Sequence, residues 1–184
     1  MSARIAPAAS PHPAFVEEQL ARLMPPGLAP LALFTTVARD ERLFRRLMGG
    51  ALLDRGALTL RQREIVIDRV TAGCGAEYEW GVHVAFFGRK ADLTDAELRS
   101  LVHGSADDAC WVAPEERALV RLCDRLHDTC TIDDALWDEA RRHFSEMALI
   151  EILMLAGSYR MVSYLANALR LPLEPFAARF PDAH

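Results

Sequence analysis

The sequence predicts a single all-α domain, a bundle of about eight helices, and three observations support this prediction. Apolar residues recur at helical spacing along most of the chain. Two threonines each stand three residues before a glutamine or glutamate, the spacing of a helix capping box. Strand-type alternation is absent beyond very short stretches. The length of 184 residues fits one domain, and 51% hydrophobic with 26% charged residues is an ordinary globular composition.

The chain is expected to divide into an arm, a domain and a tail. Residues 1–13 hold three prolines and no continuous apolar segment, so they are predicted to form a flexible arm, not a secretory signal. Residues 14–173 form the predicted domain. Residues 174–184 form a C-terminal tail, in which Phe176 and Phe180 are expected to dock on the domain or on a partner subunit.

Prolines and one aspartate delimit the first three expected helices. A short helix over residues 14–23 is ended by two consecutive prolines, and a second apolar segment begins near residue 31. Asp40 is the expected N-cap of a third helix over residues 41–53, because its side chain can accept from a free amide of the first turn. Gly56 lies just past the expected end of that helix.

The two capping boxes open the middle helices. Thr59 with Gln62 begins a helix that glycines at positions 73 and 75 interrupt. The next helix is expected over residues 76–87. Thr94 with Glu97 begins a short helix that ends by Gly104.

Three further helices are expected in the last third of the chain. Pro114 fits the first turn of one helix, and a second begins between residues 131 and 134. The last helix covers residues 145–169 and is apolar around much of its circumference. Such a helix is buried in its domain or at a subunit interface.

Charge and composition argue against several classes of partner. The net charge of −5 disfavours nucleic acid and anionic membranes, which require concentrated positive charge. No uninterrupted apolar run reaches the roughly 18–20 residues that span a bilayer. We therefore expect a cytoplasmic protein without a nucleic-acid or membrane partner. No glycine-rich phosphate loop, nucleotide fingerprint or metal motif is found, so no cofactor or metal is expected.

The four cysteines show no CxxC spacing, which would indicate a dithiol redox site or a zinc site. Cys123 and Cys130 stand seven residues apart and are expected to share a buried helix face. Cys74 lies near an expected helix N-terminus, where the helix dipole can activate a thiol. A single cysteine in such a position is more often inert packing, so both interpretations stay open.

The residues best suited to chemistry are Glu64, Glu79 and His83. Glu79 and His83 are four residues apart, so they meet on one helix face, and a carboxylate beside an imidazole can move a proton near neutral pH. The turn at positions 73–75 would fold the preceding helix back and let Glu64 face this pair. Pairs of this kind also occur on solvated surfaces without function. Likewise, Tyr78 and Trp80 are more often core or interface aromatics than ligand contacts.

This segment resembles the AhpD-like superfamily, which includes carboxymuconolactone decarboxylases and alkylhydroperoxidase D proteins. Glu64, then Glu-Tyr-Glu-Trp at positions 77–80, then His83, is similar to the form on the decarboxylase side of the superfamily. On the peroxidase side a CxxC pair occupies the positions that here hold Ala76 and Glu79. The resemblance covers about residues 31–173.

The resemblance implies an all-α fold in an obligate homo-oligomer, a dimer, trimer or hexamer. It implies a small-molecule substrate, Glu64, Glu79 and His83 as catalytic residues, and Tyr78 and Trp80 as substrate-binding residues. Because Ala76 and Glu79 replace both redox sulfurs, the dithiol peroxidase cycle cannot run as it does in those relatives.

Three functions remain open from the sequence. The first is an acid/base enzyme of the decarboxylase, isomerase or hydratase kind acting on a small carboxylated or carbonyl compound. An arginine would have to bind a substrate carboxylate, and Arg69, Arg89 and Arg160 are the candidates. The second is a peroxiredoxin-type antioxidant activity through Cys74. The third is a non-catalytic oligomeric binding protein.

Overall fold

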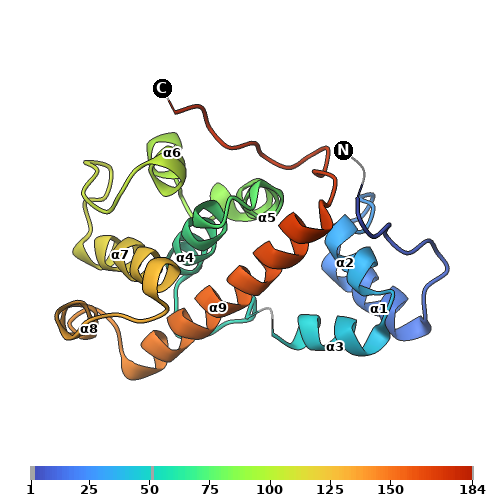
Figure 1. Cartoon of the computed structure of the whole chain (residues 1–184), viewed down its shortest axis with the longest axis horizontal. Helices are drawn as coiled ribbons and strands as arrows, with labels where there is room; N and C mark the ends of the chain where they lie inside the picture. The colour runs from blue at the N-terminus through green and yellow to red at the C-terminus, as the bar shows by residue number, and fades with distance from the viewer. Residues whose placement is uncertain (1–2, 51, 184) are drawn as a thin grey trace.

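The computed structural model describes residues 3–50 and 52–183, and this part of the chain is helical without any strand (Figure 1). The all-α prediction is confirmed, and the described residues form nine α-helices and one π-helical turn where about eight helices were expected. The helices are α1 (Ala14–Leu23), α2 (Ala32–Val37), α3 (Glu41–Gly49), α4 (Leu60–Gly73), α5 (Glu77–His83), the π-turn η1 (Val84–Gly88), α6 (Asp95–His103), α7 (Pro114–Thr129), α8 (Asp134–Arg141) and α9 (Glu146–Leu169).

Helix α4 lies at the centre of the larger part of the fold, where it packs against α5, α6, α7 and α9. Its residues Ile65 and Ile67 are fully buried in a core shared with Leu119 of α7 and Ile152 of α9. Helix α9 runs diagonally across the molecule from this part to the smaller group of α1, α2 and α3 (Figure 1). A second apolar cluster joins α2 and α3 to α5 and to the C-terminal half of α9.

Both predicted capping boxes are present. The Thr59 side chain accepts from the Gln62 amide while the Gln62 side chain accepts from the Thr59 amide, and Thr94 and Glu97 form the same pair. Asp40 also caps its helix, as predicted, by accepting from the Leu43 amide. These local rules held because each depends only on residues within one turn of the chain.

One expected helix end is wrong, and a second helix reaches its expected end in a different conformation. The helix expected over residues 41–53 ends at Gly49, and Leu52 already has a positive φ of 49°. The helix expected over residues 76–87 stays α-helical only as far as His83 and continues as the π-turn η1. π-turns inside helices occur often at functional sites, because the extra residue redirects the side chains around it.

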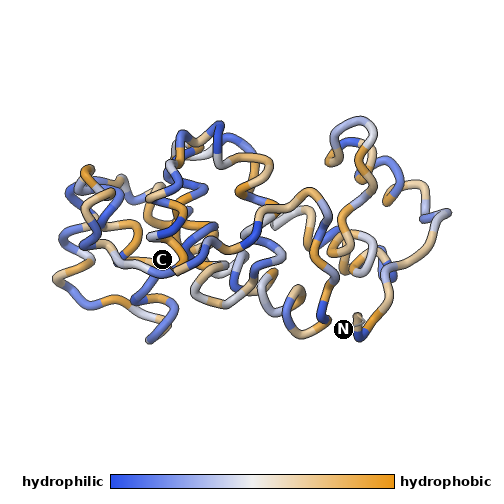
Figure 2. The backbone as a smooth tube through the Cα atoms, turned by 90° about the horizontal axis from the view of Figure 1, so that it is seen from above, coloured by the Kyte–Doolittle hydropathy of each residue, from blue (hydrophilic) through white to orange (hydrophobic). Residues whose placement is uncertain are grey.

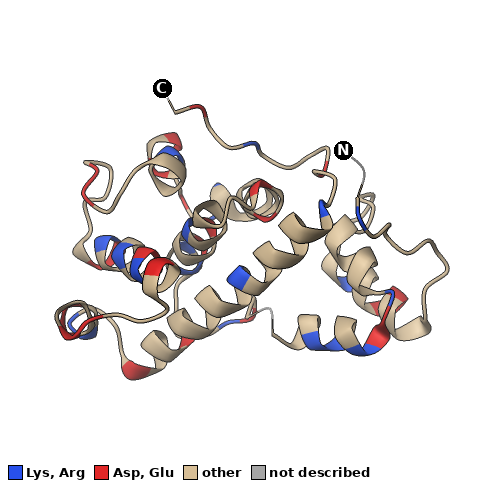
Figure 3. Cartoon of the chain, viewed as in Figure 1, with Lys and Arg blue, Asp and Glu red and all other residues tan. Residues whose placement is uncertain are grey.

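Helix α9 is long and apolar enough to cross a membrane by length and composition alone, but it belongs to the core of this fold. Its buried face packs on α4. Figure 2 shows that hydrophobic and hydrophilic residues are interspersed along the described backbone as a whole. Figure 3 shows almost no charge along α9, whereas α3 and α7 carry many charged residues. Its outer face exposes several large apolar side chains, namely Met147, Ile150, Leu153, Met154, Met161 and Tyr164. Burial of this face between copies of the chain stays a prediction.

Both chain ends lie against the domain. In the N-terminal arm, the Arg4 amide donates to the Leu169 carbonyl and the Ala8 amide donates to the Thr35 carbonyl. In the tail, the Phe180 ring packs against Trp80 with ring centroids 5.2 Å apart. Phe180 of the tail therefore packs against the domain, one of the two positions expected for it.

Candidate active site

A tight turn brings Glu64 onto the helix that carries His83. Helix α4 ends at Gly73, and Gly75 takes the left-handed φ of +62° that a residue without a side chain adopts easily. Helix α5 then packs back against α4. The contact between Glu64 and His83, 19 positions apart in the sequence, results from this turn.

Three buried side chains meet around the imidazole of His83. The Nδ1 atom lies 2.8 Å from Oε2 of Glu64, and the Nε2 atom lies 3.0 Å from the hydroxyl of Tyr159 on α9. The Nε2 atom is also 3.5 Å from Oε1 of Glu79. The structure thus brings the three predicted catalytic residues together. Glu64 makes the shorter contact with His83, and Glu79 makes the longer one.

The surroundings of His83 favour its charged form. Burial acts to lower the pKa of the imidazole, but hydrogen bonds to Glu64 and Glu79 and the charges of both carboxylates raise it to about 10. His83 is therefore an imidazolium at neutral pH, with both nitrogens as donors. Burial also raises the pKa of the Tyr159 hydroxyl, which stays protonated.

Arg63 is a site residue that the sequence interpretation missed. Its guanidinium donates to Oε1 of Glu64 at 3.0 Å, and its side chain is only 12% exposed. Its charge lies over the ring of Phe87 in η1, 5.4 Å from the centroid. Glu64 is thus held between two cations, Arg63 and His83, which fixes both of its oxygens.

Asp68 lies one turn beyond Glu64 on α4 and is fully buried. Neither of its carboxyl oxygens has a hydrogen-bond partner among the described residues. Burial raises its pKa well above the ordinary value, and the charge of His83 only partly opposes this effect. This shift favours the neutral carboxylic acid form of Asp68.

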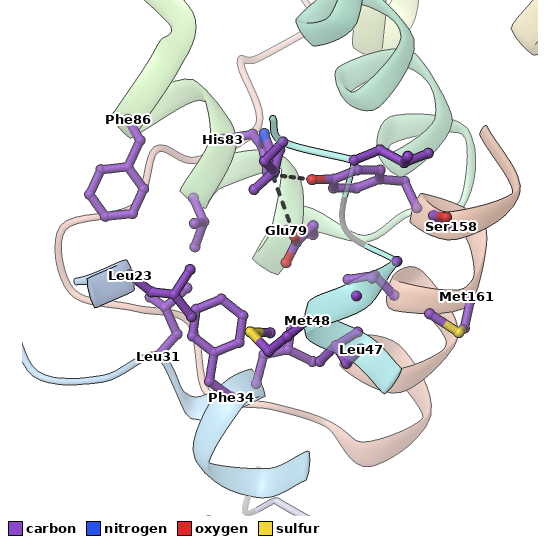
Figure 4. A pocket seen from close by; sticks show the side chains of 18 of the residues that line it. Leu23, Leu31, Phe34, Leu47, Met48, Glu79, His83, Phe86, Ser158 and Met161 are labelled. Atoms are coloured by element: carbon purple, nitrogen blue, oxygen red, sulfur yellow. Dashed lines mark hydrogen bonds and ion pairs between the residues drawn. The ribbon is translucent and has the colours of Figure 1, made fainter. Parts of the chain in front are cut away.

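A cavity of about 480 Å³ lies beside this cluster (Figure 4). Most of its walls are apolar and come from α2, α3, η1 and α9, including Phe34, Leu47 and Phe86. Glu79, His83 and Tyr159 supply a polar wall, and Oε2 of Glu79 has no hydrogen-bond partner among the described residues. Apolar walls with a few convergent polar groups are typical of a small-molecule site.

None of the arginines proposed to bind a substrate carboxylate borders this cavity, and no arginine or lysine occurs among the described residues that line it. Arg69 pairs with Asp124 at 2.6 Å. Arg160 donates to the Tyr164 hydroxyl and to the His127 carbonyl. Arg89 follows η1 and is likewise not part of the lining.

Tyr78 and Trp80 lie outside the cavity lining as well. The Tyr78 hydroxyl donates to Glu174 at 2.6 Å and accepts from the Leu33 amide at 3.0 Å. Trp80 is 1% exposed and packs against the tail. The structure therefore does not place either residue where a ligand of this cavity would touch it, because both point from α5 toward α2 and the tail.

The cysteines are separate from the cluster around His83. The Cys74 thiol is 3.9 Å from Nδ1 of His127 and does not line the cavity. Cys123 is buried, which raises the pKa of its thiol to about 12, but Cys130 is exposed. The prediction that Cys123 and Cys130 share a buried helix face is therefore wrong, because α7 ends at Thr129 and Cys130 takes a left-handed conformation. Within the described residues, no group of side chains is arranged to hold a metal ion.

The raised pKa of His83 predicts that the protein loses stability as the solution becomes alkaline. Between the unfolded value of 6.5 and the folded value of about 10, the folded state binds a proton that the unfolded state has released. The contribution of His83 to stability is fully present below pH 6.5 and is lost as the pH rises through 10. Urea unfolding between pH 7 and 9 should show a decline of at most about 1.4 kcal/mol per pH unit from this group. A His83→Gln variant with the same decline would contradict this assignment.

Comparisons with known proteins agree with this architecture. Three solved structures share the fold over nearly the whole chain. The first is an uncharacterized peroxidase-related protein from Silicibacter sp. TM1040, with 16% identity, 96% of this chain and 94% of that chain covered and a TM-score of 0.78. The second is an alkylhydroperoxidase AhpD core protein, uncharacterized and peroxidase-related, from Ralstonia eutropha JMP134, with 15% identity, 95% of each chain covered and a TM-score of 0.75.

The third structure is a variant of the debrominase Bmp8 in complex with 2,3,4-tribromopyrrole, with 15% identity, 96% of this chain and 94% of that chain covered and a TM-score of 0.71. A search of the curated proteins found no match. At these identities the likeness shows the fold alone, an all-α bundle of the AhpD-like kind. The model of the carboxymuconolactone decarboxylase family matches residues 41–122, the segment from α3 into α7 that holds Glu64, Glu79 and His83. This match agrees with the resemblance of that segment to the family.

Proposed function

We propose that the chain is an acid/base enzyme that moves protons on a small, largely apolar carbonyl compound. The observation that carries the proposal is that Glu79 and Tyr159 both line an apolar cavity and both contact Nε2 of His83, while Oε2 of Glu79 has no hydrogen-bond partner among the described residues. A base and a hydrogen-bond donor side by side are the two groups that enolisation of a carbonyl compound requires.

The protonation states assign a role to each group. The His83 imidazolium donates from Nδ1 to Glu64 and from Nε2 to the Tyr159 oxygen. The Tyr159 hydroxyl keeps its own proton for an acceptor in the cavity, which would be the substrate carbonyl oxygen. Glu79 would take the proton from the adjacent carbon as the C–H electron pair moves toward that oxygen. Tyr159, supported by the charge on His83, would stabilise the resulting enolate.

The same enolate can lead to different products. Return of the proton to another carbon gives an isomer. Loss of carbon dioxide from a β-keto acid breaks a C–C bond and leaves the same enolate, to which the His83 imidazolium would then supply a proton, becoming a neutral imidazole. The cavity favours the first reaction, because the described residues that line it include acidic groups but no arginine or lysine to bind a substrate carboxylate.

Deuterium exchange tests this proposal. A panel of uncharged apolar ketones and lactones would be incubated with the protein in D₂O, and loss of the α-proton followed by NMR. We expect exchange with the wild type and a loss of roughly 100-fold or more in Glu79→Gln, which cannot act as the base. A Cys74→Ser control, altered outside the cavity, should keep the wild-type rate. Tight binding of these compounds without exchange would favour the non-catalytic binding protein.

The thiol alternative has its own test. Cys74 lies outside the cavity, and Ala76 and Glu79 occupy the positions of the two sulfurs in the related peroxidases. We therefore expect no consumption of hydroperoxide with a dithiol reductant in either the wild type or Cys74→Ser. Consumption by the wild type that disappears in Cys74→Ser would replace the acid/base proposal with a thiol peroxidase.

A further inference from the structure

The C-terminal tail runs from the end of α9 across α5 toward α6 (Figure 1). The Ala178 amide donates to the Gly81 carbonyl at 3.0 Å, and the Phe180 amide donates to Oε1 of Glu77 at 3.1 Å. Beyond α5, Nε2 of His103 lies 2.7 Å from the Pro181 carbonyl oxygen. These backbone contacts fix the course of the tail along the helix that carries Glu79 and His83.

The tail lies so close to α5 that only glycine fits at position 81. A Cβ atom added to Gly81 would clash with the backbone oxygen of Ala178, which cannot swing aside as a flexible side chain would. The tail is therefore an integral layer of the fold, and its first residues are held in a defined position.

One carboxylate of this tail joins two separate elements of the site. Oε1 of Glu174 accepts from the Tyr78 hydroxyl at 2.6 Å and from the Ala32 amide at 2.7 Å. The Tyr78 oxygen in turn accepts from the Leu33 amide at 3.0 Å. These bonds satisfy two amides in the first turn of α2, which receives no side-chain cap from Leu31.

The two joined elements form opposite parts of the candidate site. Helix α5 carries Glu79 and His83, while α2 supplies Leu33 and Phe34 to the apolar wall of the cavity. The two helices have only 7 and 6 residues. Helices this short do not hold their conformation alone, so their relative position depends on tertiary contacts.

We propose that Glu174, acting through Tyr78, is a positioning residue that holds the cavity wall of α2 at a fixed distance from the site helix α5. The proposal rests on the proposed function only where it treats the cavity as a substrate site. It gives the tail and Tyr78 a structural role in the site. Because Glu64 holds His83 independently, loss of the link should disturb the wall and leave the acid/base groups in place.

Amide hydrogen exchange tests the link without any substrate. In Glu174→Ala, the Ala32 and Leu33 amides should exchange at least about 10-fold faster. Ala32 loses its acceptor, and Leu33 loses the Glu174 contact that holds its acceptor, the Tyr78 hydroxyl, in place. Glu174→Gln should restore most of the protection, since its amide oxygen can accept both bonds. Arg179→Ala, elsewhere in the tail, is the matched control and should leave exchange in α2 unchanged. Protection in Glu174→Ala equal to that in Arg179→Ala would overturn the proposal.

Two further readouts separate positioning from general destabilisation. Tyr78→Phe breaks the bond to Glu174 from the side of α5 but leaves Ala32 bonded to Glu174, so the effects of Tyr78→Phe and Glu174→Ala on α2 exchange should be less than additive. If the proposed reaction is found, Glu174→Ala should raise KM several-fold and keep kcat within about twofold, because binding depends on the wall and chemistry on Glu79. Additive effects of the two substitutions, or a fall in kcat with unchanged KM, would count against the link. Fast α2 exchange in a protein without carbonyl activity would support the link and reject only the proposed reaction.

Discussion

Replacing His83 with alanine is expected to abolish the proposed proton transfer and to destabilise the folded protein by roughly 3–5 kcal/mol. The substitution removes the cation that lies between two buried carboxylates, Glu64 and Glu79. Arg63 still compensates Glu64, but Glu79 makes no other ion pair in the described structure. A buried carboxylate that loses its partner either bears the full desolvation cost or takes up a proton.

Urea unfolding and the deuterium-exchange assay measure the two effects on the same preparation. His143→Ala is the matched control, because His143 is exposed near the end of α8, and a surface change of this kind alters stability by about 0.5 kcal/mol or less. Retained turnover in His83→Ala would rule out the mechanism. Unchanged stability would show that the two carboxylates do not depend on His83.

The fold could be predicted largely from local signals. Thr59 and Thr94 mark helix starts because a capping box involves residues three positions apart, and the long apolar helix α9 stands out by composition alone. The π-turn after His83 could not be predicted in this way, since the apolar run continues through it without a break. Within this turn, Phe86 packs against Phe176 of the tail, a contact between distant parts of the chain that no local pattern indicates.

The candidate site could be predicted in part. The four-residue spacing placed Glu79 and His83 on one face, and the glycines at positions 73 and 75 correctly suggested that Glu64 would face them. Tyr159 comes from a helix 76 positions away, and no local pattern connects it with His83. Only the packing of α9 against α5 makes this contact.

Tyr78 and Trp80, the expected substrate-binding residues, lie outside the cavity lining for a related reason. Helix α5 is buried on nearly every side, so adjacent residues on it meet different neighbours. Glu79 and His83 face the cavity, whereas Tyr78 and Trp80 face α2 and the tail. The sequence identifies all four as site candidates, but it does not state which side of the helix the cavity occupies.

Replacing Glu64 with glutamine is expected to lower the pKa of His83 from about 10 by roughly one to three pH units. The carboxylate of Glu64 makes the shortest polar contact with the imidazole and raises its pKa both by hydrogen bonding and by charge. Glutamine can keep a hydrogen bond to Nδ1 but carries no charge, so burial would then oppose the imidazolium with less compensation. NMR titration of the imidazole Cε1 proton measures this change directly. An unchanged value would show that Glu79 alone sets the charge of His83.

Asp68→Asn distinguishes the effect of charge from a general effect of changing a carboxyl on α4. Asp68 occupies the next turn of the same helix and is equally buried, but burial raises its pKa well above the ordinary value and so favours its neutral form. Asparagine replaces one neutral group with another, so we expect the pKa of His83 to stay near 10 in this variant. A fall in Asp68→Asn as large as that in Glu64→Gln would mean that Asp68 is ionised. The site would then hold three buried carboxylates and only two cations. The proposal that Glu79 acts as the base assumes two carboxylates balanced by two cations, so it would no longer apply.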